Sequence, residues 1–115
     1  QQLDRDKMRG AIFENMIVME AIKHRYNMGL EGGVFFYRDS NQNEVDILIK
    51  QEGELTAIEV KSSMTYSSSF EKTLTQIEGW IKPPISKKAI VYSGDFENTS
   101  GNINLINYRH ISSIL

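Results

Sequence analysis

The feature that most constrains the fold is a pair of apolar segments separated by a short polar turn. The segments EVDILIK, residues 44–50, and LTAIEVKS, residues 55–62, flank a turn centred on Glu52-Gly53. A glycine after a polar residue, between two runs rich in Val and Ile, is typical of a β-hairpin. The sequence therefore predicts two adjacent antiparallel strands whose register is set by this turn.

Counting outward from the turn gives the pairing of the two strands. Because side chains alternate between the faces of a strand, one face of the hairpin is expected to be apolar and to carry Val45, Ile47 and Ile49. The predicted partners across the hairpin are Val45 with Val60, Asp46 with Glu59, Ile47 with Ile58, and Lys50 with Leu55.

The other face of the predicted hairpin carries Asp46, Glu59 and Lys61. Directly opposed side chains have Cβ atoms roughly 4.5–5.5 Å apart, and two like charges there repel by roughly 3 kcal/mol at an effective dielectric constant near 20. A shared proton, the ammonium of Lys61 or a bound cation would offset this repulsion. The alternative interpretation is a solvated charged face.

Composition narrows the kinds of site that the chain can build. The 115 residues suit one domain, 1–115, with no cysteine and two histidines, His24 and His110, which are expected on the surface. A metal site would therefore use oxygen ligands and take Mg²⁺, Mn²⁺ or Ca²⁺. The 13 basic and 15 acidic side chains give a net charge of -2, hence no overall attraction to nucleic acid.

The hydropathy pattern argues against a membrane protein. No apolar run approaches the roughly 18 residues of a membrane span, and no charged and then apolar leader opens the chain. We therefore expect a soluble, cytoplasmic protein without a membrane partner. The first residue is Gln1 rather than methionine, which indicates a fragment of a longer protein whose other parts share in the function.

The apolar periodicity predicts the element order α, β, β, β, α, β, β. The expected elements are a helix from Asp4 to about Asn27, a strand at Val34–Tyr37, the two hairpin strands, a helix that begins near Ser68 and ends before Pro83-Pro84, and strands at Lys88–Ser93 and Ile103–Tyr108. A strand, a helix and a further strand form a crossover unit, so residues 55–62 and 88–93 are predicted to be parallel neighbours. The sheet should be mixed, with helices covering both faces.

Two details of the helices also follow from the sequence. Met8, Met16 and Met19 lie on one stripe of the first helix and are expected to fill the core. Ser68, with Glu71 three residues later, has the spacing of a capping box at the start of the second helix.

This layout of a helix with a glutamate, strands with Asp and Glu-x-Lys, a helix and a strand resembles the PD-(D/E)XK nuclease superfamily. More closely, GAIFENMIVMEAIK (Gly10–Lys23), YRDSNQNEVDILI (Tyr37–Ile49) and AIEVKSS (Ala57–Ser63) resemble the uncharacterised domain found C-terminal to the ATPase of many prokaryotic AAA+-type proteins. The resemblance implies a restriction-endonuclease-like α/β core, αβββαβ, as the C-terminal part of a longer ATPase. Val45 stands where the proline of the superfamily motif would precede Asp46.

The resemblance also assigns roles to four residues. Glu14, Asp46, Glu59 and Lys61 match the active-site positions of the superfamily. Asp46, Glu59 and the backbone carbonyl of Val60 would bind Mg²⁺ or Mn²⁺, and Lys61 would orient water or offset the charge of the transition state. Glu14 would hold a metal-bound water or a second ion. The alternative for Glu14 is an ion pair with Lys61 or Arg25.

We therefore weigh three functions. The first is an Mg²⁺-dependent phosphodiesterase domain that acts on DNA beside the AAA+ ATPase region of the same protein. The second is a nuclease-fold module without turnover, which binds nucleic acid or protein beside the motor. The third is a regulatory cap, or a dimerisation cap that would make the chain a homo-oligomer. No phosphate-binding GxxxxGK[ST] loop occurs in the sequence, so the ATPase itself would lie outside it.

Overall fold

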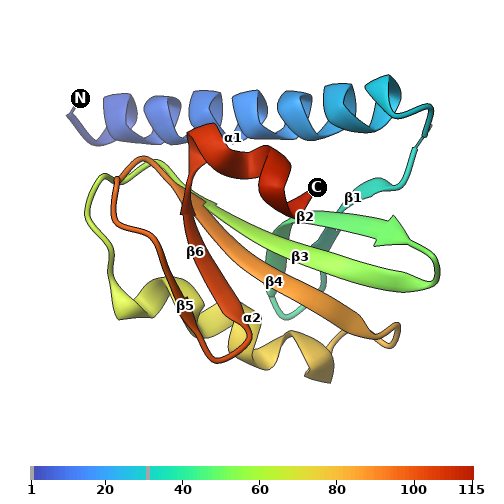
Figure 1. The fold of residues 1–115 in the computed structure, drawn as a ribbon. Helices are drawn as coiled ribbons and strands as arrows, with labels where there is room; N and C mark the ends of the chain where they lie inside the picture. The colour runs from blue at the N-terminus through green and yellow to red at the C-terminus, as the bar shows by residue number, and fades with distance from the viewer. Residues whose placement is uncertain (1, 31) are drawn as a thin grey trace.

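The computed structural model describes residues 2–30 and 32–115, which form a six-stranded mixed sheet between a long helix and a layer of short helical segments (Figure 1). The elements are α1 (Gln2–Asn27), β1 (Val34–Arg38), β2 (Glu44–Gln51), β3 (Glu54–Lys61), η1 (Ser68–Glu71), α2 (Lys72–Gln76), η2 (Ile77–Gly79), β4 (Ile85–Tyr92), β5 (Asn98–Ser100), β6 (Ile103–Asn107) and η3 (Tyr108–Ile114). The strand order is β1-β2-β3-β4-β6-β5. The expectation of an α/β fold with a mixed sheet is confirmed. No helix in the described residues has the length and apolar character needed to cross a membrane.

The hairpin of β2 and β3 forms with the predicted register. Glu52 and Gly53 have φ angles of 54° and 82°, and two left-handed residues in succession define the tight turn that suits the twist of a hairpin. The pairing of Ile47 with Ile58, and of Lys50 with Leu55, is as predicted. Strand β4 lies parallel to β3, as the crossover argument requires.

The sheet separates two apolar cores. On one face, Ile17 and Ala21 of α1 pack with Ile58, Val91 and Ile111. Helix α1 and the C-terminal η3 lie together on this side of the sheet (Figure 1). The opposite face is covered by α2 and its flanking turns, and its buried residues include Leu48, Leu55, Leu74, Ile77, Ile90 and Tyr92. Central strand β4 is therefore buried on both faces, as expected.

The prediction that Val45 shares a face with Ile47 and Ile49 is wrong. Between β1 and β2, Phe35 pairs with Leu48 but Tyr37 pairs with Val45, so one residue of β1 lies opposite two of β2. Such a β-bulge shifts the alternation of side chains by one residue. Val45 consequently packs in the core on the α2 side, whereas Ile47 and Ile49 pack on the α1 side.

The prediction that the methionine stripe of α1 fills the core is also wrong. The exposed fractions of Met8, Met16 and Met19 are 64%, 41% and 54%. The residues that contact the sheet are Ile17 and Ala21, which are fully buried on the other side of the helix. Helical periodicity identified two apolar stripes, and the structure buries the one with the smaller and branched side chains.

The second predicted helix is shorter and less regular than expected. It is divided into η1, α2 and η2, and the sequence reasoning missed the short strand β5 altogether. The capping box is not formed, because Ser68 lies inside η1 and it is Ser67 whose side chain accepts the cap hydrogen bond, from the Ser69 amide. Glu71 instead accepts a hydrogen bond from the Tyr66 hydroxyl.

An ion pair ties the α2 layer to the sheet. Lys88 of β4 is buried, and its Nζ lies 2.8 Å from a carboxylate oxygen of Glu78. We expect Glu78→Gln to lower the free energy of unfolding by about 1–3 kcal/mol, because it leaves the buried ammonium without its charged partner. Chemical denaturation measures the loss. The exposed Glu52→Gln serves as the charge-matched control, and an equal effect of the two variants would contradict the interpretation.

Candidate functional site

A polar pocket of about 340 Å³ opens where β2 and β3 approach α2. Three of the four predicted site residues line it, namely Asp46, Glu59 and Lys61. Trp80 forms part of the wall, with its ring stacked on that of Tyr37 at a centroid distance of 6.3 Å. The remaining lining residues are Gln42, Asn43, Glu44, Lys72, Thr73 and Gln76. The hairpin thus brings the predicted acid, acid and lysine set into one pocket.

Asp46 lies at the β-bulge, where the hairpin ladder gives way to a side-chain contact. The backbone pairs of β2 and β3 run from Gln51 with Glu54 to Ile47 with Ile58. Beyond them, Oδ2 of Asp46 accepts a hydrogen bond from the Val60 amide at 2.8 Å. Asp46 and Glu59 are therefore not the ladder pair that the register predicted. The bulge instead fixes the Asp46 carboxylate against the backbone of β3.

Glu59 is the most unusual residue of the pocket because its carboxylate is buried. The residue is 5% exposed, and Oε1 has no hydrogen-bond partner among the described residues. Burial, followed by the negative charge of Asp46, raises the pKa of Glu59 to about 8. The Nζ of Lys61 lies 3.8 Å from Oε2 and lowers this pKa in part. The carboxyl group of Glu59 therefore releases its proton at a higher pH than an exposed glutamate does.

Lys61 lies at the end of β3, between the carboxylate of Glu59 and an aromatic ring. Its Nζ is 5.6 Å from the ring centroid of Phe70, and its side chain is 39% exposed. A lysine at this boundary can present its charge to the pocket while its stem stays packed. The arrangement leaves the ammonium accessible to an anionic ligand.

Glu14 reaches the same carboxylates from α1. It lines a second pocket, of about 390 Å³, on the α1 side of β2, and Asp46 lines both pockets. Burial and a hydrogen bond with Asp46 raise the pKa of Glu14 to about 7, while the charge of Arg38 lowers it in part. The alternative prediction was an ion pair of Glu14 with Lys61 or Arg25. Among the described residues, Lys61 instead pairs with Glu59, and Arg25 donates to the Gly32 carbonyl. Glu14 therefore faces Asp46 rather than a basic partner.

The pocket offers a divalent cation a small set of oxygen donors. In residues 2–30 and 32–115, no three His, Asp or Glu side chains are grouped closely enough to hold one metal ion. Two carboxylates and a backbone carbonyl, those of Asp46, Glu59 and Val60, form the smaller set that the sequence predicted. Mg²⁺ commonly uses one or two carboxylates and keeps several waters, so this set suits it. The unpaired Oε1 of Glu59 is the atom that such an ion would satisfy.

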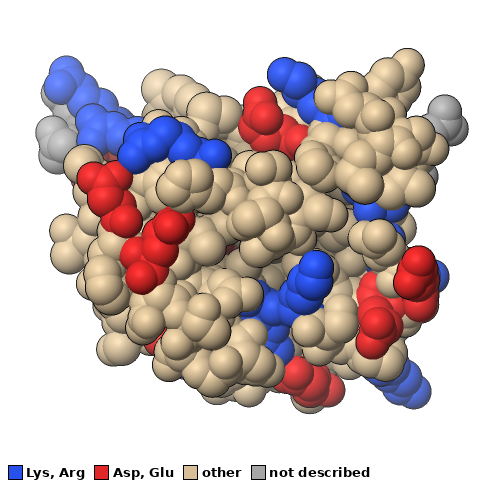
Figure 2. Space-filling model, viewed as in Figure 1, with Lys and Arg blue, Asp and Glu red and all other residues tan. Residues whose placement is uncertain are grey.

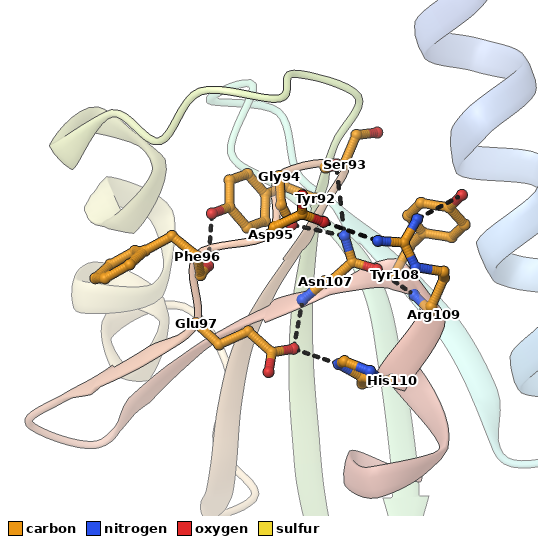
Figure 3. Close-up of polar contacts among 10 residues, drawn as sticks. All are labelled: Tyr92, Ser93, Gly94, Asp95, Phe96, Glu97, Asn107, Tyr108, Arg109 and His110. Atoms are coloured by element: carbon orange, nitrogen blue, oxygen red, sulfur yellow. Dashed lines mark hydrogen bonds and ion pairs between the residues drawn. The ribbon is translucent and has the colours of Figure 1, made fainter.

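A second polar cluster, which sequence reasoning missed, lies where β4 and β6 end (Figure 3). Asn107 is buried, and its Nδ2 donates to the Gly94 carbonyl at 2.6 Å. The Oδ1 of Asn107 accepts a hydrogen bond from the backbone N–H of Arg109. The backbone N–H of Asn107 donates a hydrogen bond to the carboxylate of Glu97. Glu97 also contacts Nδ1 of His110 at 2.6 Å, so the histidine expected on the surface is exposed but paired. These contacts hold the loop after β4 against the end of β6. The cluster lies outside the two pockets that Asp46 lines.

Fold and pocket together define a class: an α/β domain in which a β-bulge and a parallel crossover bring neighbouring carboxylates together beside a lysine. A family model described as "Domain of unknown function (DUF4143)" matches residues 9–111, so the chain belongs to this family. The match covers both hairpin strands and all four candidate site residues. No curated protein matches the chain.

Proposed function

We propose that this domain is an Mg²⁺- or Mn²⁺-dependent phosphodiesterase that acts on DNA beside an AAA+ ATPase region of the same protein. The observation that carries the proposal is the buried, unpaired Oε1 of Glu59 next to Asp46 and Lys61 in one pocket. These positions are the ones that the resemblance to the PD-(D/E)XK superfamily assigns to an active site. The resemblance to domains that follow an AAA+ ATPase supports the proposal that an ATPase region belongs to the same protein.

The proposed chemistry divides among the pocket residues. A divalent cation, when bound, would polarise a phosphoryl oxygen and lower the pKa of a water molecule. Asp46, held in place by the Val60 amide, and Glu59 would supply its carboxylate ligands, together with the Val60 carbonyl. Lys61 would contact a non-bridging phosphate oxygen and stabilise the charge that grows there. Glu14 would accept a hydrogen bond from a water on the α1 side.

Substrate would approach from the open side of the pocket. Lys72, at the start of α2, adds a second cation to the lining, and Asn43 and Gln76 add hydrogen-bonding groups. Phosphate contacts of this kind position a nucleic acid without reading its sequence. The net charge of -2 means that binding depends on this local set rather than on the charge of the whole chain.

A second candidate is a nuclease-fold module that binds nucleic acid or protein without turnover. Two observations favour it. The carboxylates do not form a group of three in the described residues, and both Glu14 and Glu59 have raised pKa values, about 7 and 8. A site that keeps its protons at neutral pH would bind a cation weakly. The two candidates differ in whether metal binding and cleavage occur.

A thermal shift titration with Mg²⁺ or Mn²⁺, after treatment with a chelator, tests the metal site. A cation that binds only the folded state adds about 2.7 kcal/mol at 100 times its dissociation constant, or roughly 10 °C in melting temperature. We expect this gain for the wild type and its loss in Asp46→Asn, because one ligand charge is gone. Glu52→Gln, at the exposed hairpin turn, should keep the gain.

Nicking of supercoiled DNA separates the two candidates. We expect Lys61→Ala to lose roughly 100-fold in cleavage rate while keeping the thermal gain with Mg²⁺, because the lysine acts on the substrate rather than on the cation. A thermal gain without nicking would support the module without turnover. No thermal gain and no nicking in the wild type would contradict the proposed activity.

A further inference from the structure

Phe36 is largely exposed although it lines a pocket of the candidate site. It belongs to the edge strand β1 and is 74% exposed. The pocket is the one of about 390 Å³ that Glu14 and Asp46 also line. Exposed apolar side chains that stand singly are common on protein surfaces. Phe36 differs from them because it lies beside two carboxylates of the candidate site, where a substrate would bind.

The pocket beside Phe36 adjoins the pocket that contains Lys61. Glu44 and Asp46, both on β2, line the two of them. The pocket with Lys61 also contains the buried Glu59, whose Oε1 lacks a partner among the described residues, and it is the one in which we propose that a phosphate reacts. A ligand with its phosphate there can extend past Asp46 into the second pocket. Phe36 would therefore meet the part of the ligand next to that phosphate.

The charges of the second pocket suit a nucleobase better than a further phosphate. Three carboxyl groups line it, those of Glu14, Glu44 and Asp46, against one basic side chain, Arg38. The carboxylates would repel a phosphate that entered this pocket. The amino group of a base, by contrast, can donate hydrogen bonds to carboxylate oxygens, as that of cytosine does to Asp and Glu. Asn15 adds an amide that can both donate to and accept from the edge of a base.

Arg38 supplies a cation beside the aromatic ring. Its Nε lies 3.1 Å from a carboxylate oxygen of Glu44, and the two side chains are 67% and 52% exposed. An ion pair as exposed as this one contributes little to stability, so the guanidinium can exchange it for another anion. Arg38 can therefore contact a backbone phosphate while a base stacks on Phe36. Aromatic side chains beside basic groups are the means by which many proteins bind single-stranded nucleic acid.

The chain offers few cations for binding a nucleic acid by its phosphates alone. Its net charge is -2. On the face drawn in Figure 2, Lys and Arg gather over the N-terminal end of α1 and are otherwise scattered among Asp and Glu. Proteins that bind a duplex without reading its bases depend on many phosphate contacts. Stacking on an aromatic side chain adds affinity that needs no charge, but it requires an unpaired base.

We propose that the pocket beside Phe36 holds an unpaired, amino-bearing base next to the phosphate that the domain cleaves, so that its substrate is single-stranded DNA. The base stacks on the ring of Phe36, the carboxyl groups around it accept from its amino group, and Arg38 contacts a neighbouring phosphate. The inference rests on the proposed function, since it names the form of DNA that the same site accepts. It has a separate test, because binding that depends on a base can be measured without cleavage.

Fluorescence anisotropy with three labelled strands of equal length tests the pocket, in a chelator and again with Ca²⁺, which also takes oxygen ligands. The first strand alternates cytidine and thymidine, the second contains thymidine alone, and the third has abasic sugars throughout, so all three carry the same phosphate charge. We expect the wild type to bind the first strand roughly ten-fold more tightly than its duplex form and than the abasic strand. The second strand should bind more weakly than the first and more tightly than the abasic strand, because thymine can stack but lacks the amino group.

Phe36→Ala should weaken binding of the first strand roughly ten-fold and leave binding of the abasic strand unchanged, whereas Phe36→Trp should keep the wild-type affinity. Phe35→Ala is the matched control on the same strand. Phe35 is 52% exposed, lies on the opposite face of β1 because neighbouring side chains alternate, and lines neither pocket. Its removal should leave binding of all three strands unchanged.

The outcomes separate this inference from the proposed activity. No binding by the wild type, equal binding of any two strands, or equal losses in Phe36→Ala and Phe35→Ala would overturn the base pocket. Base-dependent binding without nicking in Mg²⁺ would support the base pocket and contradict the activity. Nicking that Phe36→Ala leaves unchanged would support the activity and contradict the base pocket.

Discussion

Asn107→Ala is expected to lower the free energy of unfolding by about 3–5 kcal/mol. The amide side chain is almost fully buried and satisfies two backbone groups, the Gly94 carbonyl and the Arg109 amide (Figure 3). A buried backbone group that loses its partner costs about 1–3 kcal/mol, and the variant leaves two, together with a cavity. Urea denaturation of the wild type and the variant measures the difference.

Two further variants make this expectation specific. Asn104→Ala, on the same strand, removes a hydrogen bond that is exposed, between Asn104 and Thr99, and should cost less than about 1 kcal/mol. Asn107→Asp keeps the shape but places a carboxylate against the Gly94 carbonyl, so it should destabilise the domain increasingly as the pH rises above the pKa of the new acid. An Asn107→Ala cost as small as that of Asn104→Ala would show that the loop after β4 is held by other contacts.

The second large effect is a fall in stability as the pH rises, measured in a chelator. Burial raises the pKa of Glu59 from 4.5 to about 8. Between these values the folded chain keeps a proton that the unfolded chain has released, so each rise in pH favours unfolding. One pH unit corresponds to about 1.4 kcal/mol, which makes the total loss roughly 3–5 kcal/mol by pH 8. Glu14, with a pKa of about 7, acts in the same direction.

Glu59→Gln replaces the titrating carboxyl group with an amide, so this position no longer contributes to the difference in bound protons between the folded and unfolded chain. We expect the variant to lose the part of the decline that Glu59 causes, to keep the part that Glu14 causes, and to be more stable than the wild type at pH 8. Glu54→Gln, which replaces an exposed acid on the same strand, should keep the decline. Carboxylates with lowered pKa values, such as Glu78 and Glu97, lose their contribution only below pH 4.5, so they do not mask the result. Identical pH profiles of Glu59→Gln and wild type would contradict the assignment of the proton.

The elements that could be predicted were those set by short-range rules. The turn at Glu52-Gly53 fixed the hairpin register because two left-handed residues admit one geometry. The apolar run from Ala89 to Val91 identified a strand covered on both faces. By contrast, the bulge that turns Val45 toward α2 depends on pairing with Tyr37 in another strand. No periodicity within one strand contains that information.

The candidate site was predictable as a set of residues but not as a geometry. Counting placed Asp46, Glu59 and Lys61 on neighbouring strands, and all three line one pocket. The sequence could not show that Asp46 would bond to the Val60 amide, or that an oxygen of Glu59 would be left unpaired. Both depend on how the bulge and α2 close around the carboxylates. The methionine stripe of α1 was misassigned because a helix with two apolar stripes does not reveal which one meets the sheet.

The packing of α1 against η3 means that the first helix of the domain completes its core only when the last segment has been made. Ile17 and Ile111 share one core, yet 94 positions separate them in the sequence (111 - 17). During synthesis from the N-terminus, the helix is made first and the last part of the surface that buries it is made last. Until then, the core around Ile17 lacks the part that Ile111 and Ile114 supply. An unfinished chain would therefore be a substrate for chaperones, and premature stops before Ile111 should be cleared by proteolysis rather than accumulate as folded domain.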